Sequence, residues 1–225
     1  MKEVLNDNLI AALTDYKYLL EKGYPQKEIQ KLTGNRYDLD RTQRSILKRG
    51  IATDLQVKNR KNKTISGIQD QSLIVDGYNV LYTVSNYLHG RIVFKANDNF
   101  IRDTGEVTGK NHTPPLFNKA IDSFLEVISG SNISGITMVF DSPVSKSGEL
   151  ASMISVLLQK HKIHGDSIAI KSTDKYLKEF TNGIVCTSDS VILDNCKSQI
   201  FDLAGYILNE KFKARFLSIC DFLES

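Results

Sequence analysis

The sequence predicts an α/β fold: a three-layer domain with a central, mainly parallel sheet, preceded by a small helical N-terminal segment. Residues 1–71 carry the apolar spacing of helices and end in a polar, basic run. From residue 72 onward, short apolar strands alternate with amphipathic helices, which is typical of a parallel sheet covered by helices on both faces. We therefore divide the 225 residues into a helical N-terminal segment with a basic linker, 1–71, and an α/β domain, 72–225.

Three helices are expected in the N-terminal segment, because apolar side chains recur there three and four residues apart. A glycine follows the first and ends the third, and Gly34-Asn35 breaks the second. The third helix has Asp38 or Asp40 as its expected N-cap. The expected helices cover residues 2–22, 25–33 and 38–50.

Positive charge is concentrated at the front of the chain. Residues 1–72 hold 14 Lys and Arg against 9 Asp and Glu, whereas residues 73–225 hold 15 against 17. The basic run 58–64 predicts a linker or exposed loop that ends near residue 71. A basic front suits a polyanionic partner, and an acidic rear suits a cation.

Strands and helices alternate through the α/β domain and set its expected architecture. Strands are expected at residues 72–75, 92–94, 100–101, 135–140, 167–170, 184–186 and 201–203. Helices are expected at residues 79–88, 115–129, 147–161, 175–180, 190–196 and 210–223.

Several protein classes are excluded by composition. No stretch of about 18 apolar residues exists, so no membrane-spanning helix is expected. The N-terminus carries acidic residues and lacks the apolar run of a signal peptide. The three cysteines form no Cys-x-x-Cys pair, which predicts reduced thiols, no zinc site and a cytoplasmic location.

Three apolar strands each run into an aspartate: Asp76, Asp141 and Asp189. In a parallel sheet their carboxylates emerge at one edge, where open α/β sheets bind ligands. A single aspartate after a strand is ordinarily a helix N-cap, but three together repel one another and favour a bound cation. Hard oxygen ligands suit Mg²⁺ or Mn²⁺, and Asp194 is a further candidate ligand.

The segment LIVDGYNVLYT resembles the first-strand motif of PIN-like nucleases, especially the NYN-type branch. GIVCTSDSVILD resembles their late acidic motif, and MVFDSPVSKSGEL resembles their middle acidic strand. The resemblance implies a PIN-like fold in which Asp76, Asp141 and Asp189 bind metal and Asn79 helps to hold the site.

The whole chain also resembles a two-part prokaryotic family with a domain of unknown function, which joins a helical N-terminal segment to a PIN-like half. The helical motif RY-x-L-x-x-x-Q-R of that family is matched by Arg36, Tyr37, Leu39, Gln43 and Arg44.

One departure from the PIN pattern concerns a glutamate, which these nucleases usually place between the first and the later acids. No residue here clearly replaces it. The region between the motifs offers Asp98, Asp103, Glu106 and Asp122.

Basic side chains of the N-terminal segment recur at helical spacing, and together with residues 58–63 they are candidates for binding a phosphate backbone. A solvated helix face explains them equally well. Arg102 either reaches the metal edge or forms a structural pair with Asp103, and Ser147 either contacts a phosphate or simply caps a helix. The basic candidates are Arg36, Arg41, Arg44, Lys48 and Arg49.

Three functions follow from these observations. The first is a metal-dependent PIN-like ribonuclease that hydrolyses phosphodiester bonds, with RNA as partner, DNA as an alternative substrate and no membrane. The second is a catalytically degenerate, nucleic-acid-binding or regulatory protein on the same fold. The third is a phosphatase-like or nucleotide-handling enzyme, which an Asp-x-Asp after the first strand would favour and Asp76-Gly77-Tyr78 lacks.

Overall fold

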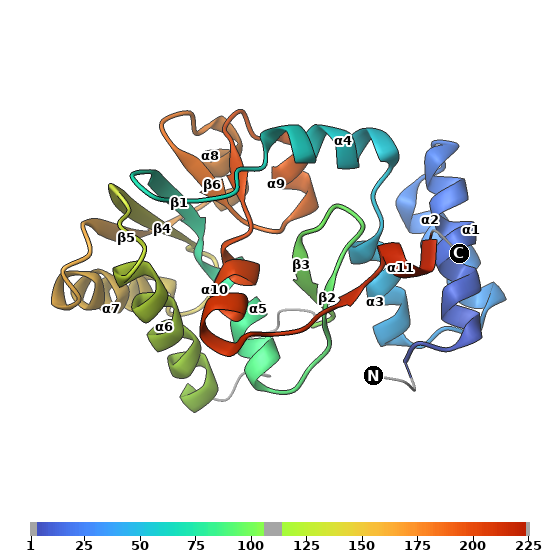
Figure 1. Cartoon of the computed structure of the whole chain (residues 1–225), viewed down its shortest axis with the longest axis horizontal. Coiled ribbons are helices and arrows are strands. Elements are labelled where there is room, and N and C mark those ends of the chain that lie inside the picture. Colours follow the sequence, from blue (N-terminus) through green and yellow to red (C-terminus); the bar gives the residue numbers. More distant parts are fainter. Residues whose placement is uncertain (1–3, 106–113, 224–225) are drawn as a thin grey trace.

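The computed structural model describes residues 4–105 and 114–223, which form a parallel sheet flanked by helices and a helical head to one side (Figure 1). The central sheet has the order β5-β4-β1-β6-β7, and each neighbouring pair is parallel. The expected α/β fold is therefore confirmed. Its strands are β1 (Ser72–Asp76), β4 (Gly135–Asp141), β5 (Gly165–Ile170), β6 (Ile184–Cys186) and β7 (Ile200–Phe201).

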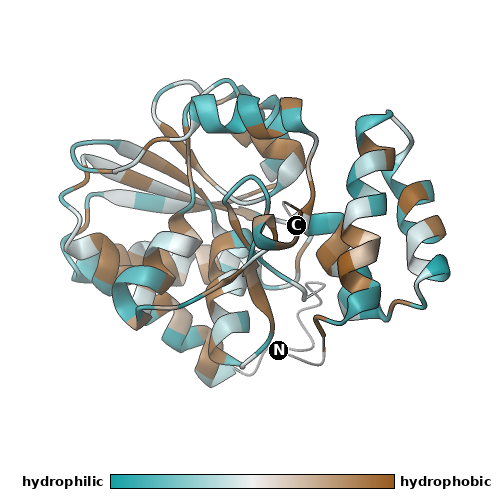
Figure 2. Cartoon of the chain, turned by 45° about the vertical axis from the view of Figure 1, so that its right-hand side comes forward, coloured by the Kyte–Doolittle hydropathy of each residue, from teal (hydrophilic) through white to brown (hydrophobic). Residues whose placement is uncertain are grey.

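Helices cover both faces of the sheet (Figure 2). Successive side chains of a strand point to opposite sides of the sheet. Leu73 and Val75 of β1 therefore pack into the large core with one set of helices, whereas Ile74 packs with the other set. The first set comprises α5 (Gly77–Leu88), α6 (Pro114–Ser129), α7 (Ser147–Lys160) and α10 (Leu203–Phe212), and the second α8 (Thr173–Glu179) and α9 (Ser190–Asn195).

The head consists of α1 (Asp7–Glu21), α2 (Gln26–Arg36) and α3 (Arg41–Gly50). Its core is completed by residues distant in sequence, among them Phe94 and Ile219. These come from a small second sheet of order β3-β2-β8 and from the C-terminal segment beside it. The remaining elements are β2 (Val93–Lys95), β3 (Ile101–Asp103), β8 (Leu217–Ser218) and α11 (Cys220–Leu223).

The expected helix over 210–223 is wrong. The chain leaves α10 at Phe212, and β8 then pairs in parallel with β2. This places Ile219 fully buried in the core of the head. Tertiary pairing with a distant strand overrides the local helical pattern here.

The second helix also differs from expectation, because Gly34-Asn35 does not break it. Helix α2 continues to Arg36, and Gly34 lies against the guanidinium of Arg44. A Cβ at Gly34 would lie 2.1 Å from Nη1 of Arg44, so the glycine provides room for close packing. Of the two candidate N-caps of α3, Asp40 is the cap and forms a capping box with Gln43.

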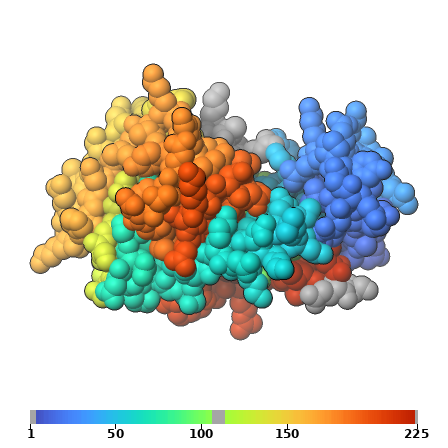
Figure 3. Space-filling model, turned by 90° about the horizontal axis from the view of Figure 1, so that it is seen from above, coloured from blue at the N-terminus to red at the C-terminus, as the bar shows by residue number. Residues whose placement is uncertain are grey.

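The expected basic linker is a helix, α4 (Asp54–Lys63), which begins with a capping box between Thr53 and Gln56. It lies between α9 and the head, as the space-filling view shows in cyan (Figure 3). The side chain of Arg60 is only 2% exposed, whereas the side chains of an exposed linker would be in contact with solvent.

Arg60 belongs to a chain of ion pairs that we call the buried arginine cluster: Arg60, Asp98, Arg102 and Asp194. Arg60 donates to Asp98 and Asp194 at 2.6 Å each, and Arg102 donates to both oxygens of Asp98 at 2.7 Å. Burial by itself raises the pKa of Asp98, but Arg102 and Arg60 outweigh it and hold that pKa below its usual range. The cluster joins α4, α9 and the β2–β3 hairpin.

Cys186, Cys196 and Cys220 are free thiols, as the sequence indicated. Among residues 4–105 and 114–223, no helix is both long and apolar enough to cross a membrane.

Replacing Arg60 by Ala should destabilise the protein by about 3–5 kcal/mol, because it leaves Asp98 buried with one guanidinium instead of two. Urea unfolding at neutral pH measures the loss. Lys61→Ala, on the exposed side of the same helix, should stay within about 0.5 kcal/mol of the parent protein. Equal effects of the two substitutions would mean that the cluster adds nothing to stability.

Candidate functional site

Three of the predicted site aspartates lie at one edge of the central sheet. Asp76 ends β1, Asp141 ends β4, and Asp189 follows β6 after two residues. The strands are adjacent and parallel, with Asp76 opposite Val139 and Val75 opposite Cys186. The expectation that the three share the carboxyl edge is therefore confirmed.

A fourth carboxylate, Asp174 at the start of α8, joins this edge and was not foreseen from the sequence. The backbone N–H of Thr173 donates to Asp141 at 3.1 Å, which brings the start of α8 to the end of β4. Burial first, and then the charges of Asp189 and Asp141, raise the pKa of Asp174. The available signal was its position four residues after the end of β5, the same strand-then-acid pattern as the other three. We call Asp76, Asp141, Asp174 and Asp189 the carboxylate group.

Asp76 is the most enclosed member of the carboxylate group. Its Oδ1 accepts the backbone N–H of Asn79 at 3.2 Å, and its Oδ2 accepts the hydroxyl of Thr187 at 3.0 Å. Burial raises the pKa of Asp76 to about 7, and the charges of Asp189 and Asp174 add to the effect, while the two hydrogen bonds oppose it.

The DGYN and TSD motifs form one hydrogen-bonded unit. The side-chain oxygen of Asn79 accepts the backbone N–H of Ser188 at 2.8 Å and its hydroxyl at 3.0 Å. Thr187, besides donating to Asp76, accepts the backbone N–H of Asp189 at 3.1 Å. Asn79 thus holds the loop that carries Asp189 against the helix that follows Asp76, in agreement with its expected supporting role.

The carboxylate group has the donor chemistry for a hard divalent cation, but it is not a ready-made site. Within the described ranges, no three His, Cys, Asp or Glu side chains are grouped so that they could hold a metal ion. Asp76 and Asp189 cap α5 and α9. Capping leaves lone pairs on the same carboxylates, and in the described part of the chain Oδ2 of Asp141, Oδ2 of Asp189 and both oxygens of Asp174 accept no hydrogen bond.

Asp194 does not belong to this group. Its oxygens accept from Arg60 and from Gln56, at 2.6–2.8 Å, so it is a structural partner rather than the fourth ligand that we expected.

None of the described acids between the motifs joins the carboxylate group either. Asp98 lies in the buried arginine cluster, Asp103 accepts from Arg49 and Thr83, and Asp122 is exposed on α6. Glu106 lies outside the described residues.

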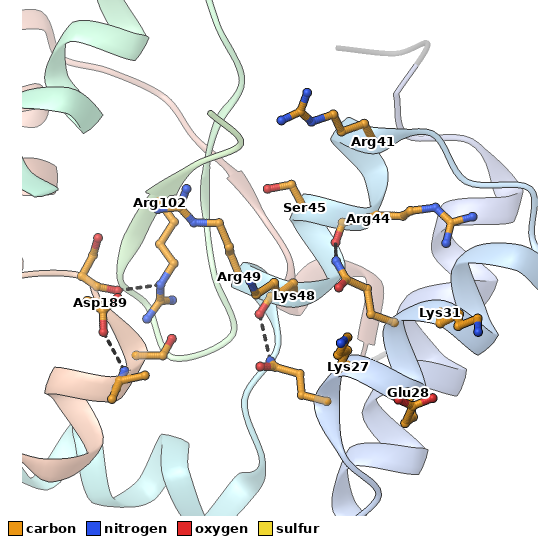
Figure 4. A pocket seen from close by; sticks show the side chains of 15 residues that line it. Lys27, Glu28, Lys31, Arg41, Arg44, Ser45, Lys48, Arg49, Arg102 and Asp189 are labelled. Atoms are coloured by element: carbon orange, nitrogen blue, oxygen red, sulfur yellow. Dashed lines mark hydrogen bonds between the residues drawn. The ribbon is translucent and has the colours of Figure 1, made fainter. Parts of the chain in front are cut away.

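A cleft of about 950 Å³ separates the head from the Asp189 end of the carboxylate group (Figure 4). The wall formed by α2 and α3 is mostly cationic, and Glu28 is the single acid among the described residues of that wall. Lys27 and Lys31 of α2 belong to it and were missed by sequence reasoning, because α2 shows a weakly patterned polar sequence. The cations of the wall are Lys27, Lys31, Arg41, Arg44, Lys48 and Arg49.

The expected nucleic-acid residues of α3 have different environments. Arg41 and Lys48 are exposed on the cleft wall. Arg44 points away from Asp189 and donates to the Leu39 carbonyl at 2.8 Å, so its guanidinium is structural (Figure 4). Arg49 donates to Asp103 and to the Gly105 carbonyl, which ties the head to the β2–β3 hairpin.

Three other candidates are corrected by their contacts. Arg36 lies outside the residues that line the cleft, close to Asp15 and over the ring of Tyr37. Arg102 reaches the cleft beside Asp189, where it donates to the Ser188 carbonyl at 2.9 Å. It is only 2% exposed, and it pairs with Asp98 rather than with the expected Asp103.

Ser147 is buried as the first residue of α7, so it neither caps this helix nor is placed to meet a phosphate. Its hydroxyl donates to the Ser142 carbonyl at 3.3 Å, and Lys146 occupies the cap position.

Two family models match this chain in sequence. The model described as "Domain of unknown function (DUF5616)" matches residues 65–206, and the model described as "Protein of unknown function (DUF434)" matches residues 8–63. The chain belongs to the DUF5616 family. It is 32% identical over 184 residues to "Uncharacterized protein MJ0935" of Methanocaldococcus jannaschii, a match that covers 81% of this chain and 87% of the relative. No solved structure matches it.

The two-part organisation places the cleft between the two family regions. The DUF5616 region supplies the carboxylate group, and the region matched by the DUF434 model supplies the cationic wall. The expected two-part family is thus confirmed.

The raised pKa of Asp76 predicts a pH-dependent stability difference in metal-free buffer. The pKa of Asp76 lies near 7 in the folded protein, and its ordinary value is 3.8. As the pH rises, Asp76 therefore ionises in the unfolded chain before it ionises in the folded protein, so the free energy of unfolding falls between about pH 4 and about pH 7. Asp76→Asn removes this contribution. From pH 5 to pH 8 the free energy of unfolding of the variant should rise by on the order of 2 kcal/mol relative to that of the parent protein. Urea unfolding in EDTA measures this difference. Parallel pH profiles would show that Asp76 does not titrate in this range.

Proposed function

We propose that this protein is a metal-dependent, PIN-like nuclease of the cytoplasm that hydrolyses phosphodiester bonds in RNA. The observation that carries the proposal is the cleft, which has Asp189 and the carboxylate edge on one side and exposed cations of α2 and α3 on the other. Hydrolysis of a nucleic acid requires both parts: cations that bind its phosphates, and a site for the metal ion that activates a water molecule. The motif resemblance to PIN-like nucleases and the free thiols agree with it.

The ion, Mg²⁺ or Mn²⁺, would be held by Asp76, Asp141 and Asp189, with Asp174 as the added fourth carboxylate. When bound, it lowers the pKa of a water molecule and neutralises the charge that develops on the phosphate. Burial is the main cause of the raised pKa values of Asp76 and Asp174, and the charges of neighbouring carboxylates add to it. A bound cation would favour the ionised form of both side chains.

The protein's own residues orient the parts. Thr187 and Asn79 hold Asp76 and the Asp189 loop at a fixed separation through the hydrogen bonds described above. Arg102 donates to the Ser188 carbonyl at 2.9 Å and so supports the same loop from the buried arginine cluster. Lys27, Lys31 and Lys48 form no ion pair within the described residues, which leaves them available to bind phosphates.

The second candidate is a catalytically degenerate protein that binds nucleic acid in the same cleft without cleaving it. Two observations favour it: no described acid takes the place of the usual PIN glutamate, and no ready-made metal site exists in the described ranges. Both candidates share the cationic wall, so metal-dependent cleavage distinguishes them.

Asp189→Asn should lower Mn²⁺-dependent cleavage of a labelled single-stranded RNA by roughly a hundredfold or more, because it removes a ligand charge while keeping the side-chain shape. The matched control is Asp122→Asn, an exposed aspartate on α6, which should cleave like the parent protein. A parallel assay with DNA of the same sequence decides between the substrates. If no metal supports cleavage by the parent protein although it binds the RNA, the degenerate candidate replaces the nuclease.

Replacing Lys27, Lys31 and Lys48 together by Ala should weaken RNA binding and flatten its dependence on salt. Each phosphate contact on a single strand contributes roughly 0.7 to the slope of log affinity against log salt concentration, so the slope should fall by about 2. A control with the same loss of charge replaces Lys119, Lys160 and Lys197, which are exposed and lie outside the cleft lining. Identical slopes for the two triple variants would show that the cations of the cleft do not bind the phosphates of the RNA.

A further inference from the structure

A second pocket, of about 470 Å³, lies beside the carboxylate group on the side away from the cleft. It has aromatic walls from α5 and α6, and its rim is the loop that follows β4, together with the first turns of α7. We call it the aromatic pocket. Its lining residues are Tyr78, Tyr82, Phe117, Val144, Ser145, Lys146 and Leu150.

The rings of the aromatic pocket brace one another. Tyr78 and Tyr82 are stacked, with centroids 5.4 Å apart and an interplanar angle of 13°. Tyr82 meets Phe117 at 5.3 Å, and Tyr78 meets Phe140 edge-on at 4.9 Å. Tyr82 is only 7% exposed and braces the other two rings, so the partly exposed Tyr78 and Phe117 present the flat surfaces, at little entropic cost, that a stacking nucleobase requires.

The position of the aromatic pocket relative to the carboxylates is fixed by the sheet. Tyr78 stands two residues after Asp76, and the rim loop begins three residues after Asp141. Burial first, then Tyr82 and the charge of Asp141, raise the pKa of Tyr78 to about 12. Because β4, β1 and β6 are consecutive in the sheet, the carboxylate group lies between the aromatic pocket at the β4 side and the cationic cleft at the β6 side.

The rim of the aromatic pocket carries one cation, Lys146. This residue occupies the N-cap position of α7 in a left-handed conformation, with φ of 64°, and its side chain is exposed. It makes no capping hydrogen bond. A positive charge at the rim of an aromatic pocket suits a nucleotide, because the base can stack on the rings while the phosphate lies near the cation.

We infer that the aromatic pocket binds one unpaired base of a single-stranded nucleic acid whose backbone passes the carboxylate group into the cationic cleft. This inference rests on the proposed function for the nature of the substrate. A base must leave the double-helical stack to enter the pocket, so single strands bind and intact duplexes do not.

The test measures binding without cleavage, in EDTA. The probe is a short fluorescein-labelled single-stranded RNA, and a series of probes lacks one base at successive positions. Tyr78→Leu removes a partly exposed ring and should weaken binding of the intact probe by about 5- to 150-fold, the loss that removal of one base stack produces. At one probe position, omission of the base should weaken binding by the parent protein to the same extent, and on that probe Tyr78→Leu should bind like the parent protein. The matched control is Tyr87→Leu on the same helix, which packs against Phe212 outside the pocket and should bind like the parent protein.

Several results would overturn the inference: no binding of the single strand, equal binding of the matched duplex, or a loss in Tyr78→Leu that persists on every base-omitted probe. If Tyr78→Leu does not fold, Val144→Glu places a negative charge at the 39% exposed rim, and it should weaken binding of the intact probe but not of the probe that lacks the pocket base. Because EDTA prevents metal-dependent hydrolysis, these results are independent of the Mn²⁺ cleavage assay, so failure of the pocket and failure of the nuclease are distinguishable.

Discussion

The rest of the structure depends on the buried arginine cluster. Arg60 comes from the helix that leaves the head, Asp98 and Arg102 from the β2–β3 hairpin, and Asp194 from α9. The ion pairs therefore hold together three segments that are far apart in the sequence. Arg102 also donates to the Ser188 carbonyl, which extends the cluster to the loop that carries Asp189. Buried charges of this kind are retained only with complete pairing, since each unpaired charge is strongly destabilising. The cluster thus links α4, the helix that follows the head, to the loop at the carboxylate edge.

The carboxylate edge itself opposes folding. Asp76 has a pKa raised to about 7, and Asp174 is shifted in the same direction, because burial and neighbouring negative charge disfavour ionisation. The hydrogen bonds from Asn79 and Thr187 offset part of this penalty and hold the acids in place. Destabilising charge that is held by specific hydrogen bonds is a frequent property of functional sites.

Three surfaces follow one another along the carboxyl edge: the cationic cleft, the carboxylate group and the aromatic pocket. Their order follows from the parallel sheet, in which β6, β1 and β4 are adjacent and end on the same side. The head supplies one wall of the cleft, and the C-terminal segment supports the head through Ile219. The proposed passage of a single strand would therefore use both family regions of the chain.

The sequence by itself determined the α/β architecture and the shared edge of Asp76, Asp141 and Asp189, because strand periodicity and the position of an acid after a strand can be read from the sequence. It narrowed the N-cap of α3 to Asp38 or Asp40, and the structure decided for Asp40. It did not determine which charged residues are exposed. Arg60, Arg102, Arg44 and Asp194 look like surface or ligand residues in a linear pattern, and each is occupied by partners far along the chain or across a helix pair. Likewise Lys27, Asp174 and the aromatic pocket depend on contacts between distant elements. Side-chain pairing and pocket formation are decided by tertiary packing, since the energy of a charge depends on what surrounds it.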